Sequence, residues 1–480
     1  MNAPNVLWIF IEDMNDWMGC YGHRAVPTPH IDRLAEVGVR FDRAYMPAGV
    51  CSPSRSAVIT GMYQTTIGAH NHRSSRPYFR GTGMGEEYDA IPLPEGVSTI
   101  PELFRQAGYY TFIEGKTDYN FVYQNADLYD SDNGKMGFKG AREGRDWSGC
   151  PEGKPFFGQI QLTGGKQFGN PNLQRHVDPS IVDVPPYYPD HPLIRKDWAM
   201  WLESIQVFDR KVGQVLHHLE EDGLRNNTIV FIISDHGLAH IRDKQFLYDG
   251  GIRIPCIVRW PGKIDAGSIC DDLVSGIDFA PTSLSLCGLD MPEGMEGNVF
   301  LGKDAKEREY IVSARDRCDG TVDRIRCVRT KTQKYIRNYH PDRPYMQFNG
   351  YNKQQYPLWT LAPLLNRTGL LSDAKQNFLA SCRPYEEFYA LTLDPYEMDN
   401  RATDTKIQKD CAYLSDLLDS WIDNYGDQGT IPENPAVVAE EAEKMHTSHI
   451  KRMEAKGLSV DVGDEEFMAW WESQLLDESR

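Results

Sequence analysis

Two short apolar runs, far apart in the chain, constrain the fold most. Asn5–Ile11 is followed at once by two acids, and Thr228–Ser234 is followed by Asp-His-Gly. A strand without polar alternation is buried on both faces, as central strands of parallel sheets are. Ligands bind where such strands end. We therefore predict a sheet with acids and a histidine gathered at one edge.

The segments between these runs alternate between helical and strand patterns. Residues 29–38, 99–107 and 197–223 have apolar side chains at helical spacing and end at or beside a glycine. Residues 109–113 and 155–162 have the pattern of strands. This alternation predicts an α/β fold with a mostly parallel sheet flanked by helices.

The pattern changes near residue 300. Short strands are expected at 309–313, 328–336 and 388–391, separated by polar turns, which indicates a smaller antiparallel sheet. The last segment is acidic and prone to form helices. We therefore divide the chain into a catalytic domain at 1–300, a C-terminal subdomain at 301–434 and a helical extension at 435–480.

Composition excludes some partners. The 480 residues carry a formal net charge of −18, which argues against binding to nucleic acid or an anionic membrane. No apolar run approaches the roughly 20 residues that span a bilayer. The N-terminal residues lack the basic region and cleavage site of a signal peptide. As written, the chain is expected to be cytoplasmic, or periplasmic or secreted if a leader was removed.

One motif combines a thiol, a proline and an arginine. Cys51-Ser-Pro-Ser-Arg55 lies where a helix is expected to begin, and Thr60-Gly61 follows. A helix N-terminus offers unpaired N–H groups and the positive end of a dipole, and an arginine adds a bidentate donor for a tetrahedral oxyanion. The motif therefore suggests a cysteine placed for chemistry on an anion; the alternative is a buried structural cysteine beside a turn.

The polar residues that follow the two strands suggest a metal site. Carboxylate-rich sites favour Ca²⁺ or Mg²⁺, and Ca²⁺ tolerates irregular geometry better. Acids at one strand end alone would be weak evidence, but two strand ends agree here. The expected ligands are Glu12, Asp13, Asp235 and His236.

These motifs resemble those of type I sulfatases. Residues 51–61 are similar to the family signature Cys-x-Pro-Ser-Arg-x-x-x-(Leu/Ile)-Thr-Gly, and residues 394–400 to its C-terminal Asp-Pro-x-Glu-x-x-Asn. The resemblance implies an alkaline-phosphatase-like fold and adds Cys51 to the ligands named above. Glu12 stands where the family usually has aspartate.

The resemblance also implies a mechanism. A formylglycine-forming maturation enzyme oxidises Cys51 to formylglycine, and Ca²⁺ and Arg55 hold its hydrated aldehyde. One hydroxyl attacks sulfur, a general acid protonates the departing alcohol, and a base then collapses the hemiacetal to expel sulfate.

Lysines complete the implied catalytic set. Lys116 matches the family's Gly-Lys-x-His element, but Asp118 replaces the histidine. Lys244 matches a later family lysine that can bind sulfate oxygens, or serve as an acid if its pKa is depressed. Lys166 falls where many members have a further histidine, so Asp118 and Lys166 are expected as an acid–base couple, with a solvent-exposed Lys166 as the alternative.

The expected substrate is a sulfated carbohydrate, attacked at a chain end. A phosphonate monoester hydrolase or phosphodiesterase on the same framework is the alternative, and a catalytically inactive anion-binding protein is the third possibility. The side chains expected to contact the substrate are His70, His72, Arg73, His240, Arg315 and Arg317.

Overall fold

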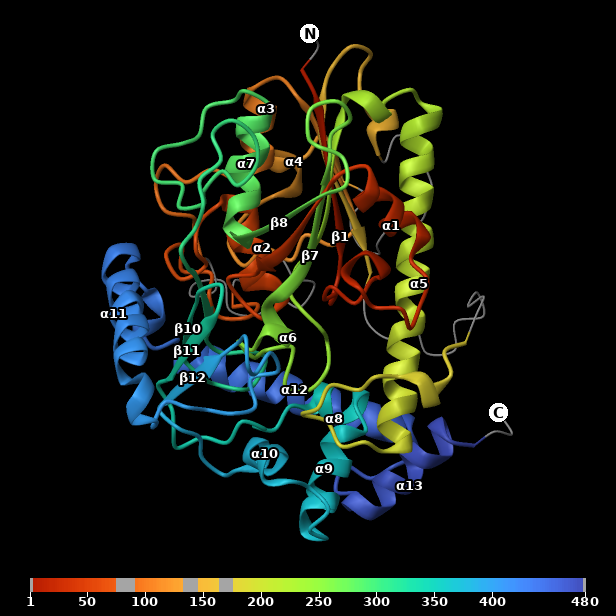
Figure 1. Cartoon of the computed structure of the whole chain (residues 1–480), viewed down its shortest axis with the longest axis vertical. Helices are drawn as coiled ribbons and strands as arrows, with labels where there is room; N and C mark the ends of the chain where they lie inside the picture. Colours follow the sequence, from red (N-terminus) through yellow and green to blue (C-terminus); the bar gives the residue numbers. More distant parts are fainter. Residues whose placement is uncertain (1–2, 75–90, 133–145, 164–175, 478–480) are drawn as a thin grey trace.

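The computed structural model describes residues 3–74, 91–132, 146–163 and 176–477. Within them the chain forms a large eight-stranded sheet between helices and a separate four-stranded sheet (Figure 1). The large sheet has the order β4-β3-β5-β1-β6-β7-β2-β8. Its strands are β1 (Asn5–Ile11), β2 (Val39–Tyr45), β3 (Tyr110–Glu114), β4 (Ser131–Asp132), β5 (Phe156–Leu162), β6 (Thr228–Ser234), β7 (Arg253–Arg259) and β8 (Ser268–Ser275).

Strand β1 shows why the sheet is covered on both faces. Leu7, Ile9 and Ile11 point into one hydrophobic core, and the residues between them point into the other. The first core is completed by α1 (Pro29–Glu36) and α5 (Pro192–Glu221). The second is completed by α2 (Cys51–Thr60), α3 (Ile100–Gln106) and α7 (Phe279–Leu286). The predicted α/β class is therefore confirmed.

The best-predicted elements are those with a clear pattern and a clear end. Strands β1 and β6 have the predicted bounds. Helix α3 begins after Thr99 with the capping box that Thr99 and Glu102 favour. Helix α5 begins at Pro192, five residues before the predicted start, because His191 caps it and proline is well tolerated in a first turn.

Strand β7 was not predicted, and it contains Pro255. It runs antiparallel to both neighbours, β6 and β2. Proline cannot donate a hydrogen bond to a sheet, so within strands it is confined to edges and bulges. Pro255 falls where the β2–β7 register shifts. The pairing of β7 with β6 covers residues 257–259 and does not include Pro255. A bulge therefore accommodates proline inside the sheet.

The small sheet is antiparallel, in the order β12-β11-β10-β9. The single strand expected at 328–336 is wrong: a turn divides this stretch, because the chain reverses between two short strands. The strands are β9 (Ile311–Arg315), β10 (Ile325–Arg329), β11 (Gln333–Asn338) and β12 (Glu386–Ala390). The remaining helices are α4 (Asn125–Leu128), α6 (Asp249–Ile252), α8 (Gly350–Gln355), α9 (Leu358–Arg367), α10 (Asp373–Gln376), α11 (Gln408–Tyr425), α12 (Pro435–Ala455) and α13 (Asp464–Leu475).

The C-terminal helices pack against the rest of the molecule. Figure 1 shows α12 in blue, crossing the molecule beside α8, and α13 near one end of α5. Phe467 and Trp471 of α13 belong to the same hydrophobic core as α5. Among the described residues, no helix has the length and apolar character needed to cross a membrane.

Candidate functional site

The large sheet brings four polar residues together where its central strands β1 and β6 end: Glu12, Asp13, Asp235 and His236. Strands β1 and β6 are parallel and in register, with Ile11 opposite Ser234, so the residues that follow them meet. The Asp13 N–H donates to Asp235 Oδ1 at 3.1 Å, and Asp13 Oδ1 lies 2.9 Å from His236 Nε2. The pairing of two strands thus builds the predicted acidic centre.

Helix α2 places Cys51 and Arg55 at this centre. Residues four apart lie on one face of a helix, so both side chains point toward the strand ends. Cys51 Sγ lies 3.3 Å from His236 Nε2. Arg55 Nε donates to Asp235 Oδ2 at 2.9 Å, and its Nη1 donates to Gln161 Oε1 at 2.7 Å. Arg55 is buried, and its Nη2 has no hydrogen-bond partner among the described residues.

Two lysines lie close to the thiol. Lys116 forms an ion pair with Glu12, and Lys244 Nζ lies 2.9 Å from Asp13 Oδ1 and 3.7 Å from Cys51 Sγ. Burial disfavours the charged form, but the neighbouring acidic groups outweigh it and raise the pKa of both lysines. This direction is opposite to the depressed pKa that an acid role would need, so both lysines are permanent cations here.

Asp118 is held as a carboxylate. Arg73 binds it through Nε at 3.2 Å and Nη2 at 3.0 Å, and Lys116 Nζ lies 3.2 Å away. Burial opposes ionisation, but Arg73 and Lys116 hold the pKa of Asp118 well below its usual range. Asp118 therefore cannot donate a proton near neutral pH. Lys166, its expected partner, lies outside the described residues.

The small-sheet segment contributes an acid that sequence reasoning missed. His72 Nδ1 lies 3.0 Å from Asp319 Oδ1, and Gln245 donates to Asp319 Oδ2 at 3.0 Å. His72 Nε2 is buried with no hydrogen-bond partner among the described residues. Burial lowers the pKa of His72 despite the attraction of Asp319. A lone acid in a turn carries no motif, so only the fold reveals this pair.

Neighbouring charges also shift the pKa values of the residues at the strand ends. Burial disfavours the charged form of His236, but Asp235, Cys51 and Asp13 outweigh it and raise its pKa to about 10. Burial likewise opposes ionisation of Asp235, but Arg55 and His236 lower its pKa to about 2. Groups of opposite charge thus stabilise one another within this centre.

Backbone strain concentrates at this site. Among the described residues, seven non-glycine residues have positive φ. Such backbone is uncommon outside glycine and clusters at functional sites. Five of the seven belong to the contacts described above: Asp13, Arg73, Asp118, Gln245 and Asp319.

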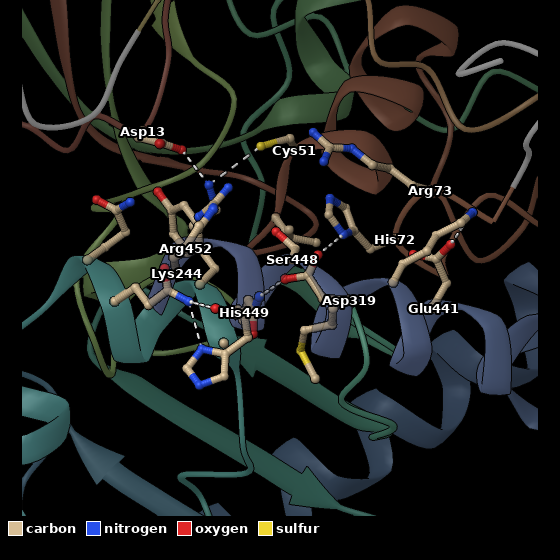
Figure 2. A pocket seen from close by; sticks show the side chains of 18 of the residues that line it. Asp13, Cys51, His72, Arg73, Lys244, Asp319, Glu441, Ser448, His449 and Arg452 are labelled. Carbon is tan, nitrogen blue, oxygen red and sulfur yellow. Dashed lines mark hydrogen bonds and ion pairs between the residues drawn. The ribbon is translucent and has the colours of Figure 1, made fainter. Parts of the chain in front are cut away.

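The site opens into a cavity of about 510 Å³. Figure 2 shows Asp13 and Cys51 on one side and α12 on the other. Besides the side chains above, the walls come from α8 and α12, whose residues were not predicted to line a site. Small-molecule sites typically have volumes of about 300–1,000 Å³, so the cavity can hold more than a sulfate group.

Two predicted substrate-binding histidines lie elsewhere. His70 is buried, and neither it nor His240 is among the residues that line the cavity in the described part of the chain. His240 stacks on Trp198 with ring centroids 4.5 Å apart, and its Nε2 lies 3.5 Å from Asp197. The long helix α5 thus packs His240 into the core.

The two predicted arginines of the small-sheet segment are also turned inward. Arg315 lies over the Phe246 ring, with Cζ 5.0 Å from the centroid. Arg317 is 1% exposed and makes a bidentate ion pair with Glu433. Within the described residues neither lines the cavity. Arg317 instead fixes the chain just before α12.

The donors at the strand ends fit a hard divalent cation. Asp13, Cys51 and His236 each offer one ligand atom within 4.8 Å of the others, as do Glu12, Cys51 and Asp235. Carboxylate oxygens predominate in this set, and such oxygens are the preferred ligands of Ca²⁺ and Mg²⁺.

Comparison with known families agrees with this geometry. The sequence model of the sulfatase family matches residues 4–157. The model described as N-sulphoglucosamine sulphohydrolase, C-terminal, matches residues 235–357, and that of type I phosphodiesterase / nucleotide pyrophosphatase matches residues 165–254.

Individual relatives extend over most of the chain. An ulvan-active sulfatase of Formosa agariphila is 33% identical over 473 residues, covering 90% of this chain and 77% of that protein. Human N-sulphoglucosamine sulphohydrolase is 26% identical, covering 87% of this chain and 89% of that protein. A structure solved with its substrate D-glucosamine-2-N,6-O-disulfate shares the fold, with a TM-score of 0.65 at 19% identity, covering 89% of this chain and 99% of that one. The chain therefore belongs to the sulfatase family, the sulfuric ester hydrolases of the alkaline-phosphatase-like superfamily.

Proposed function

We propose that this protein hydrolyses a sulfate ester on a saccharide and attacks a sulfate at a chain end. The observation that carries the proposal is the convergence of Arg55, Lys116 and Lys244 around Cys51 at the inner end of a cavity. The names of the relatives, an ulvan-active sulfatase and a sulphoglucosamine sulphohydrolase, support a carbohydrate substrate. A buried inner end favours a terminal sulfate over one within a polymer.

Cys51 is the proposed precursor of the nucleophile. Its position four residues before Arg55, with Pro53 between them, is the pattern that a formylglycine-forming enzyme recognises, so such an enzyme is the proposed maturation partner. Formylglycine would supply a hydrated aldehyde whose hydroxyl attacks sulfur and which can later eliminate sulfate. An unmodified thiol would form a stable adduct with no comparable route to release.

A divalent cation, Ca²⁺ in preference to Mg²⁺, is the proposed cofactor. It would offset charge on the sulfate oxygens. Its proposed ligands are carboxylate oxygens of the strand ends, His236 Nε2 and the modified side chain of residue 51. The supporting observation is that the donors form two groups of three that share Cys51, and that the donor atoms within each group lie within 4.8 Å of one another.

The protein's own cations are proposed to bind the sulfate. Arg55 is held by Asp235 and Gln161, and its buried Nη2, which makes no hydrogen bond among the described residues and lies 4.0 Å from Glu12 Oε1, would bind a sulfate oxygen. Lys116 and Lys244 stay protonated because their pKa values are raised, so they can hold the remaining oxygens. Fixed donors of this kind stabilise developing charge without reorganising during the reaction.

His72 is the proposed proton acceptor. Asp319 orients its Nδ1, the His72 side chain lines the cavity, and its buried Nε2 has no hydrogen-bond partner among the described residues. A lowered pKa keeps the ring neutral at neutral pH, which suits a base. Asp118 is the charge partner of Arg73 and Lys116, and a proton-transfer role for Lys166 remains a proposal from sequence.

The test is a sulfate-release assay over defined sulfated oligosaccharides, using protein co-expressed with a maturation enzyme. We expect release from a terminal sulfate, loss of activity after chelation, and recovery with Ca²⁺. The phosphodiesterase match over residues 165–254 makes phosphonate monoesters and phosphodiesters the informative alternatives. Turnover of these with no sulfate release from any saccharide would overturn the proposal.

A further inference from the structure

Helix α12 presents a polar face to the cavity. The residues that line the cavity recur three or four positions apart, which places them on one side of the helix. An ordinary surface helix turns an apolar stripe toward the protein. Here most of the stripe is polar, so it suits a polar ligand better than a hydrophobic core. Its members are Glu441, Lys444, Met445, Ser448, His449 and Arg452.

This helix is held in place before any ligand binds. Arg317 binds Glu433 immediately ahead of it. Gln354 of α8 lies with its Nε2 2.6 Å from His449 Nδ1, and Met453 is fully buried in the core shared with α5. The wall is therefore part of the folded structure and needs no ordering when substrate enters.

Arg452 and Lys244 both lie close to one aromatic ring, that of Tyr351. Arg452 Cζ is 6.0 Å from the centroid of the Tyr351 ring, and Lys244 Nζ is 5.8 Å from the same centroid. The two cations are therefore no farther apart than the sum of these distances. A sugar with its sulfate at Lys244 would therefore have Arg452 within reach, since both side chains line the same cavity (Figure 2).

Lys444 and Arg452 differ in their ion pairs within the described part of the chain. Lys444, on the same face of α12, has Nζ 2.8 Å from Glu440 and 3.3 Å from Glu441. Within the described ranges, no carboxylate lies at ion-pair distance from Arg452, although the chain as a whole is strongly acidic. An exposed arginine with a free planar fork matches a carboxylate or sulfate group.

We propose that Arg452 determines specificity by binding a second anionic group of the saccharide, a carboxylate or a second sulfate, while the first sulfate lies at Cys51. The proposal rests on the proposed function, because it assigns the far end of the same substrate site. Tyr351 lines the cavity close to both cations, so its side chain can contact the sugar that joins the two anionic groups.

The test measures binding to Cys51→Ala protein by calorimetry, so that turnover is not required. The probes are a singly O-sulfated disaccharide with a free uronic acid, its methyl ester, and a disulfated disaccharide without a carboxylate. We expect Arg452→Gln to raise Kd about 10- to 100-fold for one or both doubly charged probes, as loss of a charge-assisted hydrogen bond does. The methyl ester should change by no more than about twofold, and Arg452→Lys should retain part of the affinity.

Lys451→Gln is the matched control, because it removes the same charge from an exposed neighbour that does not line the cavity. It should leave every Kd within about twofold of the parent value. If the second group is a carboxylate, Arg452→Gln should raise Kd for the uronic acid probe alone. If the second group is a sulfate, Arg452→Gln should raise Kd for the disulfated probe. The proposal would be overturned if Arg452→Gln weakened binding of the methyl ester as much as binding of the other probes, if Arg452→Gln and Lys451→Gln had equal effects, or if no probe bound. Failure of the sulfate-release assay alone would overturn only the proposed function.

Discussion

Cys51 is buried, and within the described part of the chain its thiol has two polar contacts, to His236 Nε2 at 3.3 Å and to Lys244 Nζ at 3.7 Å. We predict that Cys51→Ala abolishes sulfate release and leaves Tm nearly unchanged, because few stabilising contacts are lost. Sulfate release and thermal melting measure the two effects. The control is Cys411→Ala, which replaces a buried cysteine of α11 and should keep full activity. Sulfate release by Cys51→Ala at the parent rate would contradict a nucleophile at this position.

His72 leads to a prediction about pH. The charged groups around it are Asp319, Arg73 and Asp118, and burial keeps its pKa below the usual 6.5. A base must be neutral, so kcat/KM should fall as pH falls through that lowered pKa. His72→Gln should reduce kcat about 10²- to 10⁴-fold, the usual range for loss of a proton-transfer group, and remove this acid limb. Asp319→Asn should lower kcat less than His72→Gln does, and it should change the pH at which the acid limb occurs. A pH profile unchanged in His72→Gln would refute the assignment.

Sequence reasoning could place the residues with recognisable motifs, but not those that only the fold brings near. Glu12 and Asp235 follow apolar strands, so parallel pairing predicts that they meet. Asp319 lies in the loop after β9 and belongs to no motif, and Arg452 belongs to a charged helix whose pattern is also that of a solvated surface. Their place at the cavity depends on long-range packing, which a local pattern does not encode.

At the scale of elements, a buried ionic network connects the small sheet to α6. Lys334 of β11 binds Asp249 at 2.6 Å and forms an ion pair with Glu397. We predict that Lys334→Met costs about 3–5 kcal/mol of unfolding free energy, because two carboxylates lose a buried partner. Urea unfolding measures the loss. Lys334→Met with Glu397→Gln should recover part of it.

Lys331, in the turn before β11, is the control for this prediction. It also pairs with acids, but at the surface, with Nζ 2.9 Å from Asp272. Exposed ion pairs contribute about 0–1 kcal/mol. Lys331→Met should therefore change the unfolding free energy by no more than that. Equal losses for the two lysine variants would show that burial does not determine the strength of this network.

Patterns predicted the elements in which local propensity and burial agree. Strands β1 and β6 are uniformly apolar, and α3 carries its own capping box, so their ends were predictable. Strand β7 was missed because Pro255 argues against a strand, and only the bulge against β2 makes it compatible. The β10–β11 hairpin was merged because its turn lacks a glycine or proline.

At the scale of the molecule, the site is assembled from both ends of the chain. The large sheet supplies the strand-end acids and α2 supplies Cys51, while the loop after β9, α8 and α12 supply the opposite side of the cavity. The division at 1–300, 301–434 and 435–480 remains a proposal about the units of the chain. The last unit shares its core with the first, so we expect the extension and the large sheet to unfold together.

That expectation gives the last prediction. Trp471 of α13 is 2% exposed and packs in the core that contains α5, so Trp471→Ala should cost about 3–5 kcal/mol. Urea unfolding followed by circular dichroism should still show one transition, at a lower midpoint. The neighbouring Trp470 is only partly buried, so Trp470→Ala should cost less than half as much. A separate early transition confined to the extension would show instead that α12 and α13 fold independently and that the cavity wall can detach from the sheet.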